Sequence, residues 1–171
     1  VGMSKIDCNS IETAKKILKK RSYRKKIILP LDFNVTEVPY SKVRSKIVKY
    51  NQISNNQAAL DLGPETIKLF KRYLRKGRTI VWNGPLGLYE KVTFSTATKE
   101  IGKLIGQLTA LSIGGGGETA DAIKKFHLQD KINHVSNGGG ATLSFLSGKK
   151  LPAITALEDN YRKFSRKVKK K

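Results

Sequence analysis

The sequence is poor in acidic residues, in cysteine and in long apolar runs. Only 13 Asp and Glu stand against 34 Lys and Arg, which gives a formal net charge of +21 at pH 7. This excess of positive charge is larger than solubility requires, so it indicates an acidic partner. Nucleic acid is the commonest polyanion of this kind, and an anionic membrane surface is the weaker alternative.

The scarcity of cysteine and of apolar runs excludes proteins with internal disulfides, cysteine metal sites or transmembrane helices. Cys8 is the only cysteine, so neither an internal disulfide nor a cysteine metal site can form, which is typical of a reducing compartment. No run of about 18 apolar residues predicts a transmembrane helix, and no signal-peptide pattern opens the chain. We therefore expect a soluble intracellular protein, in the mitochondrion or the cytoplasm. Because the chain begins at Val1 rather than at Met, a presequence or a preceding domain would not be visible in it.

Helical and strand patterns alternate along a chain whose length favours one domain. Apolar residues repeat at helical spacing over residues 10–20, and the compact apolar run Ile27, Ile28 and Leu29 predicts a buried strand within residues 25–33. Residues 34–60 have no sustained period and are rich in Asn, Gln and Ser, which predicts a loop or a short excursion from the sheet. Further helices are predicted from Pro64 onward, over residues 95–108 and over 118–126, and further strands over 78–83, 111–113 and 132–137.

This alternation predicts an α/β fold, a Rossmann-like parallel sheet flanked by helices. Ligands of such sheets bind beyond the carboxyl ends of the strands. Three glycine-bearing loops, at residues 82–87, 114–120 and 138–141, fall at that edge. Glycines between a strand and a helix can let backbone N–H groups meet phosphate oxygens, although they also serve simply as tight turns.

Polar residues in these loops are candidate ligand contacts. Asn83 is placed to hydrogen-bond a ligand, although Asn before Gly is also ordinary turn chemistry. Glu90 and Glu118 are candidates for a ribose hydroxyl and for magnesium, and Glu118 is alternatively a stabilising charge at the start of a helix. His127 and His134 have no third ligand in view, so they do not predict a metal site.

The end of the chain is strongly basic. We divide the chain into residues 1–158, a folded domain, and residues 159–171, a basic tail. Seven of the ten residues from Arg162 to Lys171 are basic and none is acidic, so we interpret this segment as a solvated or RNA-bound arm. The candidate RNA contacts are the cations of this tail and of the helix after Pro64, namely Lys68, Arg72, Arg75, Arg162, Lys163, Arg166, Lys167, Lys169, Lys170 and Lys171.

Five motifs in order resemble the phosphoglycerate kinase family. They are residues 61–67 (DLGPETI), 81–87 (VWNGPLG), 115–120 (GGGETA), 134–141 (HVSNGGGA) and 148–152 (GKKLP). Residues 29–32 (LPLD) and 6–14 extend the likeness, so it covers nearly the whole chain up to about Leu157. Residues 1–158 are therefore similar to an incomplete C-terminal, nucleotide-binding lobe of that two-lobed kinase.

The resemblance implies roles by position and ATP or ADP with magnesium as the cofactor, retained or vestigial. Asn83, Pro85 and Glu90 would face the nucleoside and its sugar. The phosphates would lie against Gly115, Gly116, Gly117 and Thr119. Glu118 stands where the family has a magnesium-binding Asp, and Gly138, Gly139 and Gly140 would line the path of the transferred phosphoryl group.

The departures from the family pattern shape the functional hypothesis. The N-terminal lobe and the opening strand–loop–helix of the C-terminal lobe are absent, so we do not expect catalysis by this chain alone. Glu118 for Asp lengthens a carboxylate arm at the magnesium position, and Asn137 stands in place of the usual Thr. Missing units would also leave a sheet edge exposed, where we expect a protein partner.

Three functions remain open from the sequence. The leading hypothesis is a degenerate kinase domain repurposed as a basic structural RNA-binding protein, a component of a ribosome or another ribonucleoprotein, including a mitochondrial one. The alternative is the C-terminal ATP- or ADP-binding half of an active phosphoglycerate kinase whose N-terminal half is on another chain or missing. The third is a module that senses ATP or ADP while bound to RNA or to an anionic membrane.

Overall fold

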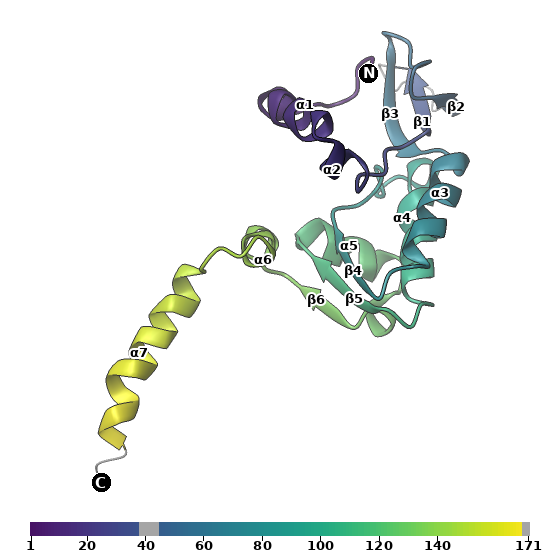
Figure 1. The fold of residues 1–171 in the computed structure, drawn as a ribbon. Coiled ribbons are helices and arrows are strands. Elements are labelled where there is room, and N and C mark those ends of the chain that lie inside the picture. The colour runs from purple at the N-terminus through teal and green to yellow at the C-terminus, as the bar shows by residue number, and fades with distance from the viewer. Residues whose placement is uncertain (38–44, 169–171) are drawn as a thin grey trace.

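The computed structural model in Figure 1 describes residues 1–37 and 45–168, with side chains up to residue 165. Its strands form two three-stranded sheets, in the orders β2-β1-β3 and β4-β5-β6. The strands are β1 (Asp32–Glu37), β2 (Ser45–Lys49), β3 (Gln57–Leu62), β4 (Thr79–Asn83), β5 (Leu111–Gly115) and β6 (His134–Ser136). The helices are α1 (Ile11–Lys19), α2 (Arg21–Arg24), α3 (Pro64–Leu74), α4 (Thr96–Ile105), α5 (Gly117–Lys125), α6 (Gly139–Leu146) and α7 (Pro152–Val168).

The second sheet is parallel and confirms the predicted α/β architecture. In its register Asn83 of β4 lies opposite Gly115 of β5, and Gly115 lies opposite Ser136 of β6. The three strands therefore end at the same level, and the three glycine-bearing loops leave the sheet at one edge, as predicted. The helices expected over residues 10–20, 95–108 and 118–126 are α1, α4 and α5 within a few residues.

One apolar cluster joins the parallel sheet to its helices. Along β4 the side chains of Ile80 and Trp82 are buried, while Val81 between them is 42% exposed, as alternation along a strand requires. Trp82 packs with Ile101 of α4 and Ile123 of α5. The core thus lies on one face of β4, directly beneath the loops at the end of the sheet.

A buried carboxylate joins the antiparallel sheet to the first helix of this core. Asp32, 2% exposed at the start of β1, accepts hydrogen bonds from the backbone N–H groups of Glu65 (3.0 Å) and Thr66 (2.8 Å) and from the Thr66 hydroxyl (2.6 Å). Glu65 and Thr66 lie in the first turn of α3, where backbone N–H groups have no partner within the helix. Asp32 therefore caps α3 from another element of the fold.

Two sequence expectations in this part of the chain were wrong. The apolar run Ile27–Leu29 is not a buried strand: β1 begins only at Asp32, and Leu29 is 55% exposed. No strand pairs with the run among the described residues, and Ile27 and Ile28 are only partly buried. The loop or short excursion expected over residues 34–60 instead contains most of β1, all of β2 and most of β3, which form a separate antiparallel sheet, because buried polar residues such as Thr36 and Gln57 interrupt the apolar period. Residues 38–44 of that span lie outside the described residues.

The boundary expected at residue 158 has no counterpart in the backbone. Helix α7 runs through it from Pro152 to Val168, so residues 159–168 of the expected basic tail are helical. Figure 1 shows α7 in yellow, extending away from both sheets. The helices α6 and α7 were both missed by the sequence analysis. Residues 169–171 lie outside the described part. Neither α7 nor any other helix of the described residues is long and apolar enough to cross a membrane.

The Asp32 cap provides a test of the fold. Replacing Asp32 by Ala should lower the free energy of unfolding by about 2–3 kcal/mol, because two N–H groups and a hydroxyl lose a buried acceptor. Urea denaturation followed by circular dichroism measures this change. Glu37→Ala, which removes an exposed carboxylate from the same strand, is the control and should stay within about 0.5 kcal/mol of the parent. Equal effects of the two substitutions would contradict the capping role.

Candidate functional site

Two of the three loops at the end of the parallel sheet are tied together by side-chain hydrogen bonds. The Asn83 side-chain amide donates to the carbonyl of Gly115 (2.7 Å). The Thr119 hydroxyl, on a residue that is 1% exposed, accepts from the N–H of Gly84 (2.7 Å) and donates to the carbonyl of Gly115 (2.9 Å). The structure thus brings the predicted residues Asn83, Gly115 and Thr119 together. It also shows that the side chains of Asn83 and Thr119 hold the two loops together, a role that the sequence did not reveal.

The third loop joins the same cluster through β6 and α6. The N–H of Gly116 donates to the carbonyl of Ser136 (3.1 Å). The hydroxyls of Ser136 and Thr142 lie 2.8 Å apart, and the N–H of Gly138 donates to the Ser136 hydroxyl (3.2 Å). Gly139 and Gly140 begin α6 with open space where a side chain would be. The predicted Gly138, Gly139 and Gly140 therefore lie next to the second loop.

Helix α5 begins with an open, positively polarised end. Gly116 precedes it at φ 101° and ψ 150°, a conformation that only glycine adopts without strain. At Gly117, the first residue of α5, no atom lies within 4 Å of the position that a Cβ would occupy. The first N–H groups of a helix have no partner within it, and they attract anions. The start of α5 therefore offers room and donors for a phosphate.

A cavity of about 740 Å³ borders this helix start. It brings together three residues predicted from the sequence, Pro85, Glu90 and Glu118. Its remaining wall is largely apolar and is formed by β1, β3 and the loop after β4, through Phe33, Ala59, Leu60, Leu62, Leu86, Gly87, Leu88 and Tyr89. Cavities of this size and character accommodate small organic ligands.

Two cations near this cavity were missed by the sequence analysis. Lys5 lines the cavity, because the segment before it is attached to β3: Met3 N–H donates to the Gln57 carbonyl (2.7 Å) and Ala59 N–H donates to the Ser4 hydroxyl (3.0 Å). Lys125 of α5 donates to the carbonyl of Glu90 (2.9 Å). No local motif marks either residue, because contacts between distant segments of the chain place both of them near the cavity.

Carboxylates give the cavity a negative wall. Burial raises the pKa of Tyr89, and the charges of Glu90, Asp121 and Glu118 raise it further. Among the described residues no three or more His, Cys, Asp or Glu gather as a metal site. Glu118 therefore offers a carboxylate beside the open start of α5 without belonging to a preformed cluster of metal ligands. Magnesium fits this arrangement, because it is commonly bound by one or two carboxylates together with the phosphates of a nucleotide.

Asp61 is a second buried carboxylate, which the sequence analysis did not select as a site residue. It is 3% exposed, lines the cavity, and accepts hydrogen bonds from the N–H groups of Leu62 (2.9 Å) and Ala97 (3.2 Å), the latter in the first turn of α4. Burial raises its pKa to about 6, although these backbone N–H groups lower it in part. A Cβ at residue 87 would overlap the Asp61 carboxylate, which explains Gly87.

The candidate RNA contacts do not form one surface. Lys68 and Arg72 are exposed on α3 and Arg75 directly follows it, whereas Arg162 and Lys163 lie on α7, well separated from α3 in Figure 1. Arg166 and Lys167 belong to the backbone of α7, and their side chains are not described. Lys169, Lys170 and Lys171 lie outside the described residues.

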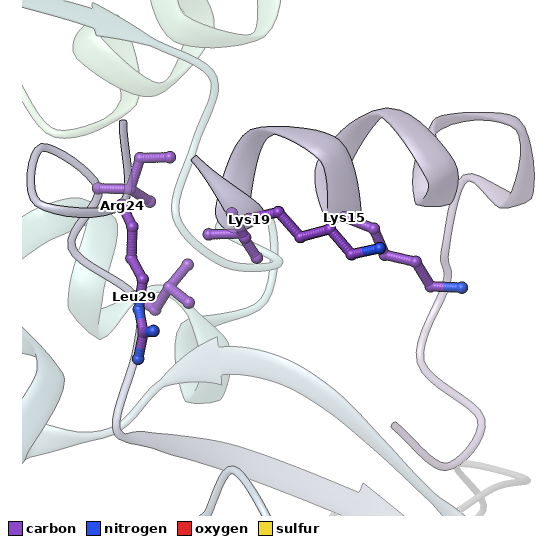
Figure 2. A pocket seen from close by; sticks show the side chains of 6 residues that line it. Lys15, Lys19, Arg24 and Leu29 are labelled. Carbon is purple, nitrogen blue, oxygen red and sulfur yellow. The ribbon is translucent and has the colours of Figure 1, made fainter. Parts of the chain in front are cut away.

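A separate groove lies between α1 and the segment that leads to β1 (Figure 2). Its volume is about 670 Å³, and it is lined by Lys15, Leu18, Lys19, Arg24, Ile27 and Leu29. None of these residues was predicted as a site residue. Every residue of α1 is exposed, so little of the protein packs against the helix that forms one side of this groove.

Comparison with known proteins identifies the family. The model of the family described as phosphoglycerate kinase matches residues 1–149. Phosphoglycerate kinases of Pelotomaculum thermopropionicum and Limosilactobacillus reuteri are 42% and 41% identical to this chain over 160 residues, which are 93% of it and 41% and 39% of theirs. Solved phosphoglycerate kinases from Coxiella burnetii and Pyrococcus horikoshii superpose with TM-scores of 0.82 and 0.79 at 33% and 32% identity, over 91% of this chain and 40% and 38% of theirs.

The fold is that of an α/β protein in which three glycine-bearing loops meet at one end of a parallel sheet. The chain belongs to the phosphoglycerate kinase family. It spans about two fifths of the length of the relatives that it matches.

The buried Asp61 predicts a pH-dependent stability. Its pKa in the folded state, about 6, lies above its ordinary value of 3.8, so the folded chain binds more protons between these values. The free energy of unfolding should therefore rise as pH falls from about 6 to about 4, with Asp61 contributing about 2 kcal/mol after allowance for solvent screening. Asp61→Asn should lack this contribution in urea denaturation at pH 4, 5, 6 and 7. If the free energies of unfolding of the parent and of Asp61→Asn changed with pH in the same way, the raised pKa of Asp61 would be refuted.

Proposed function

We propose that this chain is the nucleotide-binding half of a phosphoglycerate kinase and that it binds ATP or ADP with magnesium beside Glu118. The observation that supports this most strongly is the open start of α5 at Gly116 and Gly117, next to a cavity lined by Pro85, Glu90 and Glu118. Membership of the family supports the choice of ligand. The size of the cavity also suits a nucleoside.

Each wall of the cavity suits one part of a nucleotide. The apolar wall around Phe33, Leu60 and Leu88 would bury the base, and the Glu90 carboxylate would accept hydrogen bonds from the ribose hydroxyls. The N–H groups at the start of α5 would donate to phosphate oxygens. Magnesium held by Glu118 and the phosphates would offset the charge of Glu90 and Glu118, and Lys5 adds a positive charge to the wall.

A substitution at Gly117 tests the phosphate position. Gly117→Asp should raise the Kd for ADP with magnesium at least about tenfold, because the new carboxylate would repel the phosphates. An acidic residue in the first turn of a helix is structurally favourable, so the fold should not suffer. Gly117→Ala is the uncharged control and should bind ADP nearly as the parent does, since this position is open. Isothermal titration calorimetry measures the three values.

This titration tests separately whether the chain binds ADP and where the phosphates of ADP lie. Failure of the parent chain to bind ADP at millimolar concentration would contradict the proposed function. Binding that is equal in the Asp variant and the parent would place the phosphates elsewhere.

We further propose that catalysis requires the remaining part of a kinase, on another chain or in another segment. Phosphoryl transfer depends on positioning both substrates and on neutralising their charge, and this chain spans about two fifths of its relatives. One edge of β4 has no strand beside it among the described residues. A groove of about 390 Å³ lies there, with Ile28, Val81 and Trp82 among its lining residues. Such an edge with exposed apolar residues is a surface for a protein partner.

Complementation tests this second proposal. The part of the P. thermopropionicum kinase that lies outside the matching 160 residues would be coexpressed with this chain. Phosphoglycerate kinase activity should exceed that of either piece alone by at least about tenfold, because only the pair holds both substrates. Val81→Asp, which places a charge at the open edge of β4, should reduce this gain. The matched control is Ile47→Asp, at an exposed apolar residue on the antiparallel sheet. Turnover by this chain alone would refute the proposal.

The comparisons favour this kinase hypothesis over the RNA-binding one. The four relatives named in the preceding subsection are described as phosphoglycerate kinases, and none of them as a ribosomal or RNA-binding protein. A ribosomal role and a mitochondrial location thus have only the charge of +21 in their favour. We therefore do not propose them.

A further inference from the structure

A lysine lines the otherwise apolar and acidic cavity beside α5. Of the described residues that line this cavity, Lys5 is the one that carries a positive charge. Its side chain is exposed, and no ion pair joins it to Glu90, Glu118 or another described carboxylate. The ammonium group of Lys5 is therefore free to bind a ligand in the cavity.

The position of Lys5 is set by its neighbour in the chain. The Ser4 hydroxyl accepts a hydrogen bond from the N–H of Ala59 (3.0 Å), a residue of β3 that also lines the cavity. Ala59 directly precedes Leu60 in the apolar wall. Lys5 therefore lies on the side of the cavity where the base of a nucleotide would be buried.

The start of the chain holds this segment against the same strand. The N–H of Met3 donates to the carbonyl of Gln57 (2.7 Å), and the Gln57 side chain is buried. Gly2 has a φ of 54°, and a Cβ at this residue would overlap the Gln57 carbonyl oxygen. Glycine permits this close approach because it has no side chain. The backbone before Lys5 is thus packed on β3 rather than free in solvent.

A lysine at this position distinguishes between purine bases. Its ammonium group has donors and no acceptor. In hypoxanthine and guanine, N7 and O6 are neighbouring acceptors on one edge of the ring, and lysine side chains bind this pair. Adenine has a donor amino group in place of O6, so a lysine finds only one acceptor there, next to a donor. Lys5 therefore favours a base that has an oxygen at C6.

We propose that Lys5 determines the base preference of this site, and that the chain binds 6-oxopurine nucleoside diphosphates more tightly than ADP. This inference rests on the proposed function, because it concerns the base of the nucleotide in the same cavity. ADP still binds, since the contacts proposed for Glu90, Glu118 and the start of α5 involve the ribose, magnesium and the phosphates. The Lys5 ammonium adds hydrogen bonds to N7 and O6 of the base.

Isothermal titration calorimetry with ADP and inosine diphosphate (IDP) tests the preference. The two nucleotides have the same ribose and diphosphate and differ only at C6 and N1 of the purine. Both are titrated with magnesium, at about 0.1 M salt, into the full chain and its variants. Lys5→Met removes the donors and keeps an unbranched apolar side chain, whereas Lys5→Arg keeps the donors. The matched control, Lys68→Met, removes an exposed lysine from α3.

We expect the parent to bind IDP at least about fivefold more tightly than ADP, and Lys5→Met to bring the ratio of the two Kd values to about one. Lys5→Arg should keep the preference, because arginine also binds O6 together with N7. Lys68→Met should keep it as well. The ratio is the deciding quantity, because attraction between Lys5 and the phosphates would change both Kd values equally.

The possible outcomes distinguish this inference from the proposed function. Equal Kd values for ADP and IDP in the parent would overturn the base preference while nucleotide binding stood. An unchanged ratio in Lys5→Met would overturn the role of Lys5 in the same way. Failure of both nucleotides to bind the parent would overturn the base preference and the proposed function together.

Discussion

The candidate site depends on the common level at which β4, β5 and β6 end. Parallel pairing of Asn83 with Gly115 and of Gly115 with Ser136 brings three loops to one edge. The buried hydroxyl of Thr119 then fixes the first loop to the second by accepting from Gly84 and donating to Gly115. Because these bonds are made within the protein, the start of α5 remains open without a ligand to hold it. The site is thus preorganised by its own backbone, which lowers the cost of ordering it when a ligand binds.

Buried aspartates connect this site to the antiparallel sheet. Asp32 caps α3, and Asp61 accepts from the first turn of α4, so each helix start is held by a carboxylate from a neighbouring strand. The two positions differ in their surroundings. Asp32 receives three hydrogen bonds from α3, whereas burial keeps the pKa of Asp61 near 6. Asp61 of β3 lies on the wall of the cavity. The antiparallel sheet therefore contributes a carboxylate to the electrostatics of the candidate site.

The sequence predicted what depends on local spacing and missed what depends on distant contacts. Glycine loops after apolar strands predicted the edge of the sheet at which three loops meet, and five motifs in the family's order indicated the family. Lys5 could not be found in this way, since it reaches the cavity only because Met3 and Ser4 bind to β3. The run Ile27–Leu29 has the composition of a buried strand, but no strand pairs with it among the described residues and Leu29 is exposed. The second half of helix α7 was predicted as part of a solvated or RNA-bound arm, because positive charge dominates the composition of residues 162–171.

The proposed function requires that the loop cluster of this kinase-family chain binds a nucleotide. Hydrogen–deuterium exchange, with and without ADP and magnesium, measures this at the backbone N–H groups themselves. We expect slower exchange at residues 84–88 and 116–119 and unchanged exchange along α7. Unchanged exchange in both loops at saturating ADP would contradict nucleotide binding at this edge of the sheet.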